Sequence, residues 1–525
     1  MHKGFGKMWA TLVCLSLLGM AVGLYWNRYG VDVEPDSAVM MTAGLRFAHG
    51  EGVSIPNMLG DPKPMVWFPP VVSWVVGLFE WAGVDSQRGF GVLNPVLWGI
   101  LIGWAGWLAG RAARGVQVLG VFAAGVIMTN GAIGLAYGML YSEPFFYLWL
   151  VGALAALGCW WDRPLLRWAA LAGVAVGGAL MTRYVGLTLG LLGGCVILLR
   201  PGVDWKRRGA ALACFGVLSA GPMLGWHFWQ STLRHGESPR TLAWHPITGE
   251  LVNDGIATLS QFILPKQVAA SVASTRLIFA LACLAAGVAL WRWFGRCEGR
   301  SLREKLAATP GLVVASAVFM VIYTAFLVVS ISIADADTPL DGRILSMLVV
   351  PGVFVAVYLL AVVLWEQGSR RARGWLAAAA CGFLLLQGVA TLREIAYRNV
   401  GVIWSPGRPS PTLDALCALP GDAVIYSNDP YAIYMAVRRK TETLPFALPS
   451  PTPGERARAE LKKDMAQMRE ALARKGGWVV YWNALNFLDP VIDRELLETA
   501  VPVVDSKALE DGMLLYVAPQ TPAAR

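Results

Sequence analysis

Apolar runs separated by short polar segments that carry arginine dominate the first 392 residues of the chain. A helix needs about 20 apolar residues to cross a hydrocarbon core of about 30 Å. The pattern therefore predicts an α-helical multi-pass membrane protein with about eleven transmembrane helices. The predicted spans are 8–26, 89–110, 117–136, 144–161, 165–181, 184–199, 209–230, 275–294, 311–333, 344–364 and 375–392.

A further apolar segment, residues 66–83, contains a double proline near its start and Glu80 near its end. If this segment does not cross the membrane, every basic cluster between spans lies on the side of the N-terminus, as the positive-inside rule expects. If it crosses, all of these clusters move outside. We therefore predict an interfacial helix over 66–83, with outer loops over 27–88 and 231–274.

The first apolar run ends in Leu24, Tyr25 and Trp26 and lacks the small-residue cleavage site of a signal peptide. It is predicted to be an uncleaved first span that leaves the N-terminus in the cytoplasm. An odd number of spans then places residues 393–525 outside the membrane.

Residues 393–525 differ in kind from the membrane part. Proline-rich stretches bracket three strand-like runs (DAVIYS, WVVYW and LLYVAP) and one charged helical run, ERARAELKKDMAQMREALARKG. Strands that alternate with a helix indicate a small α/β domain. The predicted organisation is a transmembrane domain over 1–392 and a small extracytoplasmic α/β domain over 393–525.

Composition narrows the classes of function. The chain is 56% hydrophobic and 15% charged, whereas an average soluble domain is about 25% charged. The net charge of +9 arises before residue 401, in short loops between spans, which indicates membrane orientation rather than a nucleic-acid surface. The eight cysteines show no CxxC or Cys/His spacing, so neither a disulfide framework nor a structural zinc site is indicated.

Several acidic residues follow the first span, and Asp36 is the strongest candidate among them for proton transfer. In one interpretation Asp36 is the N-cap of a helix, because it lies before an amphipathic stretch. In the other, its carboxylate lies at the membrane boundary and accepts a proton. Asp32 and Glu34 compete with it for that second role.

Glu143, in the stretch YSEPFF, lies between two long apolar runs. A carboxylate at membrane depth costs at least ~2.5 kcal/mol. Glu143 is either the acidic first turn of a helix or a site residue in a hydrated cavity at the outer boundary, and we expect the latter.

Two arginines, Arg183 and Arg343, also stand on the predicted outer side, whose segments are not basic overall. Arg183 therefore needs an anionic partner. Arg343 has Asp341 two residues away, so it either pairs locally or joins the same site. Because arginine matches phosphate oxygens and keeps its charge when partly buried, two acids and two arginines on one face indicate acid/base chemistry on a lipid phosphate.

Five stretches together form a recognisable order along the chain. They are Asp36, Ser37, Ala43, Gly50 and Gly52; Phe68-Pro69-Pro70; Ser142-Glu143-Pro144-Phe145-Phe146; Thr182-Arg183-Tyr184-Val185-Gly186-Leu187; and Asp341-Gly342-Arg343-Ile344-Leu345. In this order they resemble motifs of the GT-C membrane glycosyltransferases. The most similar patterns are those of bacterial protein mannosyltransferases and aminoarabinose transferases.

The resemblance implies a glycosyltransferase that uses a polyprenyl-phosphate-linked sugar as donor. It implies Asp36 as general base on the acceptor hydroxyl, Glu143 as a second acidic catalytic residue, and inversion at the sugar carbon. The implied substrate-binding residues are Ser142, Arg183, Tyr184, Asp341 and Arg343.

The resemblance further implies a bacterial inner-membrane protein whose C-terminal domain is periplasmic. The acceptor is a lipid, a glycan or a protein, and nucleic acid is not a partner. No metal ligand is assigned; the sequence leaves a divalent metal open, with His227 and His245 as candidates that are more often ordinary polar residues.

Two other classes remain open at this stage. A transporter or flippase of a lipid-linked or anionic substrate would also need charges within the membrane, and it would favour mid-span ionisable residues and repeat symmetry. A polymerase or ligase of lipid-linked glycans would use similar donors on a different fold.

Overall fold

The computed structural model describes most of the chain. The described residues are 2–28, 30–55, 63–233, 244–265, 271–295, 301–334, 338–366, 368–401, 410–421, 423–428, 430, 433, 437, 439, 441–445, 454–482 and 503–519.

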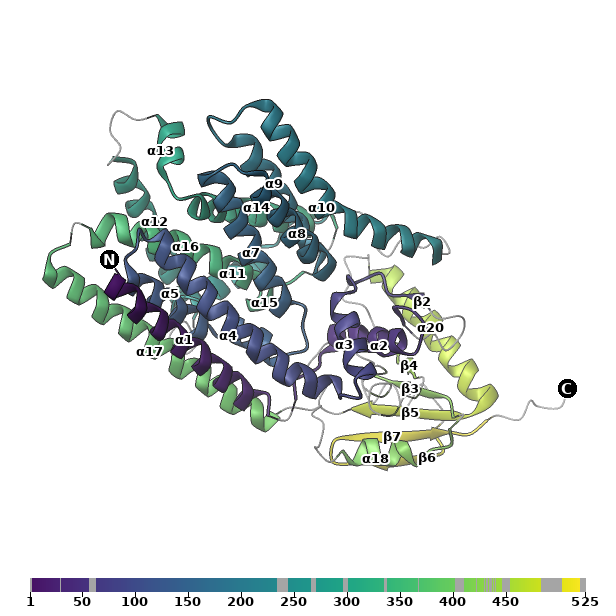
Figure 1. Cartoon of the computed structure of the whole chain (residues 1–525). Helices are drawn as coiled ribbons and strands as arrows, with labels where there is room; N and C mark the ends of the chain where they lie inside the picture. The colour runs from purple at the N-terminus through teal and green to yellow at the C-terminus, as the bar shows by residue number, and fades with distance from the viewer. Residues whose placement is uncertain are drawn as a thin grey trace. The chain divides into compact units, whose positions relative to one another are not determined.

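The predicted apolar segments all lie on helices, as Figure 1 shows. The membrane part contains α1 (His2–Trp26), α4 (Ser86–Ala112), α5 (Gln117–Thr129), α6 (Gly131–Gly138), α7 (Glu143–Asp162), α8 (Leu166–Thr182), α9 (Leu187–Leu199), α10 (Trp205–Leu233), α12 (Val272–Gly295), α14 (Gly311–Ile333), α16 (Val349–Leu359) and α17 (Arg370–Gly401). Shorter elements connect them: α11 (Gly249–Gln261), α13 (Leu302–Ala308), α15 (Gly342–Leu345), η1 (Tyr184–Gly186), η2 (Ser346–Leu348) and η3 (Leu360–Trp365).

Within the described residues, eight helices are long and apolar enough to cross a membrane, and the bent pair α5 and α6 makes a ninth if it is one span. Two shorter apolar helices, Leu166–Thr182 and Tyr184–Leu199, coincide with the remaining predicted spans. The chain is a multi-pass membrane protein. The count of eleven crossings stays a prediction, because these two helices are shorter than an ordinary span.

The predicted interfacial segment forms α3 (Val71–Trp81), a helix of 11 residues. At about 1.5 Å per residue this helix is about 16 Å long, which is too short to cross a core of about 30 Å. Helix α2 (Pro35–Ala48) packs on it at Gly44, where an added Cβ would lie 2.5 Å from the carbonyl oxygen of Ser73. A short antiparallel pair, β1 (Ser54–Ile55) and β2 (Lys63–Pro64), follows α2.

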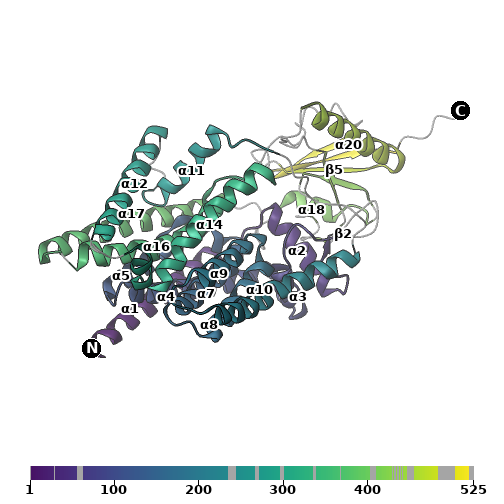
Figure 2. The same cartoon turned by 90° about the horizontal axis from the view of Figure 1, so that it is seen from above.

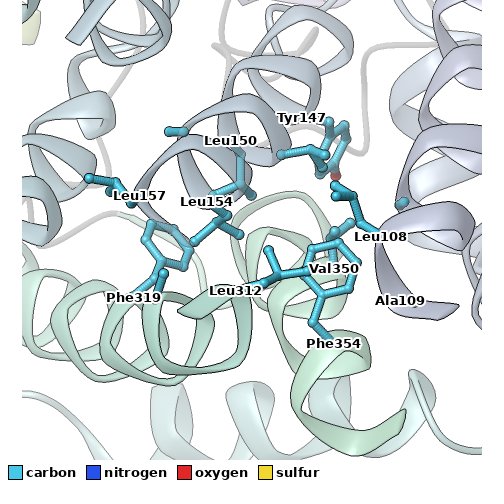
Figure 3. Close-up of a cluster of buried hydrophobic side chains, with 14 of the residues drawn as sticks. Leu108, Ala109, Tyr147, Leu150, Leu154, Leu157, Leu312, Phe319, Val350 and Phe354 are labelled. Carbon is cyan, nitrogen blue, oxygen red and sulfur yellow. The ribbon is translucent and has the colours of Figure 1, made fainter. Parts of the chain in front are cut away.

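Helix α7 lies at the centre of the membrane core, in contact with α8, α9 and α14 (Figure 2). Its inward face carries Tyr147, Leu150, Leu154 and Leu157, and Figure 3 shows these side chains among Leu108, Leu312, Phe319, Val350 and Phe354 from α4, α14 and α16. The spacing of three to four residues along α7 is that of one buried helical face.

Small residues let α7 and α14 approach closely. A Cβ added at Gly158 would lie 2.6 Å from the backbone nitrogen of Leu312, so only glycine fits at this crossing. Membrane helices associate by such close packing because lipid offers no hydrophobic driving force between them. This contact fixes the axis of α7, whose first residue is Glu143.

The C-terminal region folds as a five-stranded sheet of order β4-β3-β5-β7-β6. Its strands are β3 (Ile425–Ser427), β4 (Glu442–Thr443), β5 (Gly477–Trp482), β6 (Asp505–Ala508) and β7 (Gly512–Val517). The β3–β4 and β3–β5 pairs are parallel, whereas β5–β7 and β6–β7 are antiparallel.

A helix covers each face of this sheet. Met468 and Leu472 of α20 (Gly454–Lys475) pack with Val479 on one face. Leu416 of α18 (Pro411–Cys417) packs with Val480 on the other. Alternate residues of β5 therefore serve opposite layers, as the two-residue period of a strand requires. The small α/β fold predicted from the sequence is confirmed.

Contacts group the chain into two compact units. One comprises Met1–Val31, Val66–Val71 and Gln87–Val402, and the other comprises Asp32–Met65, Val72–Ser86 and Ile403–Arg525. Glu143, Arg183 and Arg343 belong to the first unit, and Asp36 belongs to the second. The domain boundary at residue 393 stays a prediction.

Asp511 connects α18 to the sheet and gives the C-terminal fold a pH dependence. Its carboxylate accepts hydrogen bonds from the Ser410 hydroxyl (2.6 Å), the Thr412 hydroxyl (2.6 Å) and the Thr412 backbone N–H (3.0 Å). Partial burial acts to raise the pKa of Asp511, but these donors outweigh it and hold the pKa below its usual value.

Asp511→Ala should lower the stability of the sheet at pH 7 by about 2 kcal/mol, as expected for lost hydrogen bonds to a charged group. Because the folded pKa is depressed, this stabilisation is present above the unfolded pKa of about 3.9 and disappears as pH falls through the folded pKa. Hydrogen exchange of β7 amides in the whole protein should therefore separate wild type from variant at pH 7 and less at acid pH. A separation that grows toward acid pH would contradict this assignment.

Candidate active site

Glu143 is the first residue of α7, and its side chain has no exposed surface. Pro144 lies in the first turn of the helix. A backbone N–H at this position has no acceptor within the helix, so proline costs no hydrogen bond here. We expected Glu143 to line a hydrated cavity. The structure differs from that expectation, because two guanidinium groups cover the carboxylate.

Arg183 provides one of these groups from the break between α8 and η1. Its backbone is extended (φ −150°, ψ 139°), so the chain leaves the helix at this residue. The turn closes at Gly186, where an added Cβ would lie 2.7 Å from the backbone nitrogen of Leu180. Arg183 forms an ion pair with Glu143 Oε1, and its Nη1 donates to Ser142 Oγ at 3.0 Å.

Arg343 provides the second group from the short helix α15. Its Nε donates to Glu143 Oε1 at 2.5 Å. Its guanidinium also lies over the ring of Tyr141, 4.2 Å from the centroid. Asp341 caps α15 by accepting a hydrogen bond from the N–H of Ile344 at 3.0 Å. The carboxylate of Asp341 thus orients the turn that carries Arg343.

Two buried tyrosines hold this turn in place from behind. Tyr147 donates to Ser346 Oγ (2.6 Å), which in turn donates to the carbonyl oxygen of Arg343 (2.8 Å). Tyr323 donates to the carbonyl oxygen of Ile344 at 2.8 Å. Both tyrosines and Ser346 lie outside the sequence motifs that indicated the other site residues. Tyr147 could have been found, because it lies one helical turn after Glu143 and shares its face.

The charges of the cluster do not cancel. Two guanidinium groups and one carboxylate leave one net positive charge among Glu143, Arg183 and Arg343. The carboxylate is fully buried, whereas the two arginine side chains are 17% and 22% exposed. The positive groups therefore form the accessible side of the cluster, and this arrangement suits an anion such as a phosphate.

Tyr184, next to Arg183, forms a hydrogen bond to the segment that precedes α3. Its hydroxyl donates to the carbonyl oxygen of Val66 at 2.8 Å. Its ring stacks on the ring of His227, with centroids 6.1 Å apart and planes at 8°. Tyr184 is thus placed next to Arg183 by sequence and anchored to two other segments of the same unit.

The structure brings together Ser142, Glu143, Arg183 and Arg343, as described above. Asp36 lies in the first turn of α2, in the second compact unit. The N-cap interpretation of Asp36 was wrong, because Glu34 occupies the capping position and Pro35 begins the helix.

The described residues contain no cluster of side chains that could bind a metal ion. No three His, Cys, Asp or Glu side chains lie close enough there to hold an ion. Part of the predicted outer loop 231–274, namely residues 234–243 and 266–270, lies outside the described residues.

No protein-family model matches the sequence, and a search of curated proteins finds no match. Solved structures do match. ArnT from Cupriavidus metallidurans bound to undecaprenyl phosphate aligns over 99% of this chain and 100% of its own, with a TM-score of 0.56 and 15% identity. The arabinofuranosyltransferase AftD from Mycobacteria aligns over 97% of this chain and 42% of its own, with a TM-score of 0.52 and 16% identity.

This chain has the GT-C fold. At 15 and 16% identity these likenesses establish the arrangement of the helices alone. The substrate has to be inferred from the side chains of this chain. The resemblance found in the motifs and the likeness in structure agree on the fold.

Glu143→Gln should destabilise the protein by about 2 to 3 kcal/mol, because it leaves two partly buried guanidinium groups without their counter-charge. Glu366→Gln is the matched control: Glu366 pairs with Arg114 at 3.6 Å, both side chains are exposed, and its loss should cost under about 1 kcal/mol. Thermal unfolding in detergent measures both variants. Inorganic phosphate should restore stability to Glu143→Gln more than to wild type, and equal losses in the two variants would contradict the account of the cluster.

Proposed function

We propose that this protein is a glycosyltransferase. It moves a sugar from a polyprenyl-phosphate-linked donor to an acceptor at the outer face of the membrane. The observation that carries the proposal is the cluster of Arg183 and Arg343 around the buried carboxylate of Glu143, in a chain with the GT-C fold. The bound undecaprenyl phosphate of the ArnT structure supports the choice of donor class.

The two arginines would bind the phosphate of the donor. Guanidinium groups match phosphate oxygens in geometry, and they stay charged at any physiological pH. As the sugar–phosphate bond breaks, negative charge grows on the leaving phosphate, so preorganised arginines stabilise the transition state more than the ground state. Glu143 would act through the arginines as a positioning residue, since its carboxylate is occupied by both.

Asp36 would be the general base. It removes the proton of the acceptor hydroxyl while that oxygen attacks the anomeric carbon, and the bonding pair leaves with the phosphate as polyprenyl phosphate. Attack opposite to the leaving group inverts the sugar carbon. The place of Asp36 in a helix held firmly against α3 supports the role, because a base must be positioned within one hydrogen bond or one water of its proton.

We propose a cytoplasmic N-terminus and an outer, periplasmic location for the C-terminal α/β fold. The positive-inside distribution of the arginine clusters supports this orientation. A reporter that is active only outside the cytoplasm should work when fused after Arg525. Activity there of a reporter that works only in the cytoplasm would contradict the orientation and remove the common outer site.

Arg343→Ala should weaken the binding of undecaprenyl phosphate by about 2 kcal/mol, or roughly thirtyfold, because a charge-assisted contact to the phosphate is lost. Arg276→Ala is the matched control, since Arg276 is exposed and donates to Asn253 Oδ1 at 2.9 Å rather than to Glu143. Titration of the purified protein with undecaprenyl phosphate measures both. Equal affinities in the two variants would mean that the cluster does not bind the donor phosphate.

Asp36→Asn should abolish transfer while leaving the affinity for undecaprenyl phosphate close to that of wild type. The amide keeps the size of the side chain but cannot accept a proton at pH 7. Turnover at saturating donor is the measurement, with Asp32→Asn and Glu34→Gln as neighbouring controls. Near-normal turnover in Asp36→Asn, with loss in one control, would move the base to that neighbour.

A further inference from the structure

A second feature of the membrane part is an apolar groove with a volume of about 770 Å³. Helices α4 and α8 form its walls, and small residues of α7 form its floor. The floor residues are Gly152, Ala155, Ala156 and Gly158. Leu171 and Val174 on the α8 wall are about half exposed, so the groove opens toward the surrounding lipid.

One end of the groove carries positive charge. The Arg111 guanidinium lies 5.1 Å from the ring centroid of Trp107, and the Arg167 guanidinium lies 5.0 Å from that of Trp168. Both tryptophans line the groove. Arg111 itself lines the groove, and Arg167 adjoins it through the ring of Trp168.

The nearby acid is already engaged. Asp162 lines the same end, and its carboxylate accepts a hydrogen bond from the N–H of Gly311 at 2.8 Å. Arg163 follows Asp162 directly in the chain. Three arginines and one acid leave this end of the groove with a net positive charge.

The groove extends along α7 from Phe145 to Asp162, a rise of about 25 Å at about 1.5 Å per residue. Its half from Gly152 to Asp162 rises about 15 Å, which is half of a hydrocarbon core of about 30 Å. A lipid of one leaflet with its headgroup at the arginines would fill this half. The Glu143 cluster lies at the other end of α7, so a lipid held by Arg183 and Arg343 would have its headgroup at the opposite end.

We propose that this groove binds an anionic phospholipid, with its phosphate at Arg111 and Arg167 and its acyl chain over Gly152, Ala155 and Ala156. The charge of the mouth selects an anionic headgroup, and the apolar walls select an acyl chain. The bound lipid fills the space between α4 and α8 and so supports the helix that carries Glu143. This site is independent of the proposed glycosyl transfer.

The headgroup is tested by adding phosphatidylglycerol or phosphatidylcholine to the purified protein and counting bound lipids by native mass spectrometry. Wild type should retain phosphatidylglycerol, and the double variant Arg111→Gln/Arg167→Gln should bind it about tenfold more weakly, as expected for lost charge-assisted contacts. Arg370→Gln/Arg371→Gln removes the same charge from exposed positions at the start of α17 and should bind normally. An equal loss in both double variants would show diffuse attraction to basic loops and overturn the site.

The acyl chain is tested by filling the groove. Ala155→Trp should abolish retention of phosphatidylglycerol, whereas Leu97→Trp, in the other half of the groove, should not. Loss in both would mean an occupant longer than one leaflet, such as a polyprenyl chain, and would overturn the phospholipid. Retention in both would place the lipid elsewhere. Size-exclusion elution identifies a variant that fails to fold, and the arginine variants then decide.

Discussion

The burial of the Glu143 carboxylate between two arginines is the constraint on which the site depends. A carboxylate without exposed surface is strongly unfavourable unless it is paired and hydrogen-bonded. Its partners Arg183 and Arg343 lie 40 and 200 residues further along the chain. The start of α7, the end of α8 and the turn at α15 must therefore be in contact for the negative charge of Glu143 to be paired.

Other contacts in the membrane part hold the start of α7, the end of α8 and the α15 turn together. The close contact of α7 and α14 at Gly158 fixes the axis of α7. The tight turn at Gly186 aims Arg183, and Tyr147 and Tyr323 hold the α15 turn from behind. The result is a surface on which the negative charge is hidden and the positive charge is accessible. Such a preorganised surface costs little reorganisation when a phosphate binds.

The sequence predicted the helices well, because a long apolar run has few alternatives to a membrane helix. It also predicted that Arg183 needs an anionic partner, which the ion pair with Glu143 confirms. It could not predict which acid, because pairing over such separations depends on the packing of α7, α8 and α15. Strands β4 and β6 were missed since both are short and β6 is fully exposed, without apolar alternation. The N-cap at Glu34 was not predicted, because Asp is a preferred N-cap residue and the sequence therefore pointed to Asp36.

The central claim is that a sugar leaves a polyprenyl phosphate on this protein. The direct measurement is to incubate the purified protein with a panel of polyprenyl-phosphate sugars and an extract of envelope lipids and glycans, and to analyse the products by mass spectrometry. We expect at least one donor to yield free polyprenyl phosphate together with an acceptor that is heavier by one sugar. Donors that bind with the Arg343 dependence described above but remain intact with every acceptor would contradict it, and would favour a transporter or flippase of the same lipids.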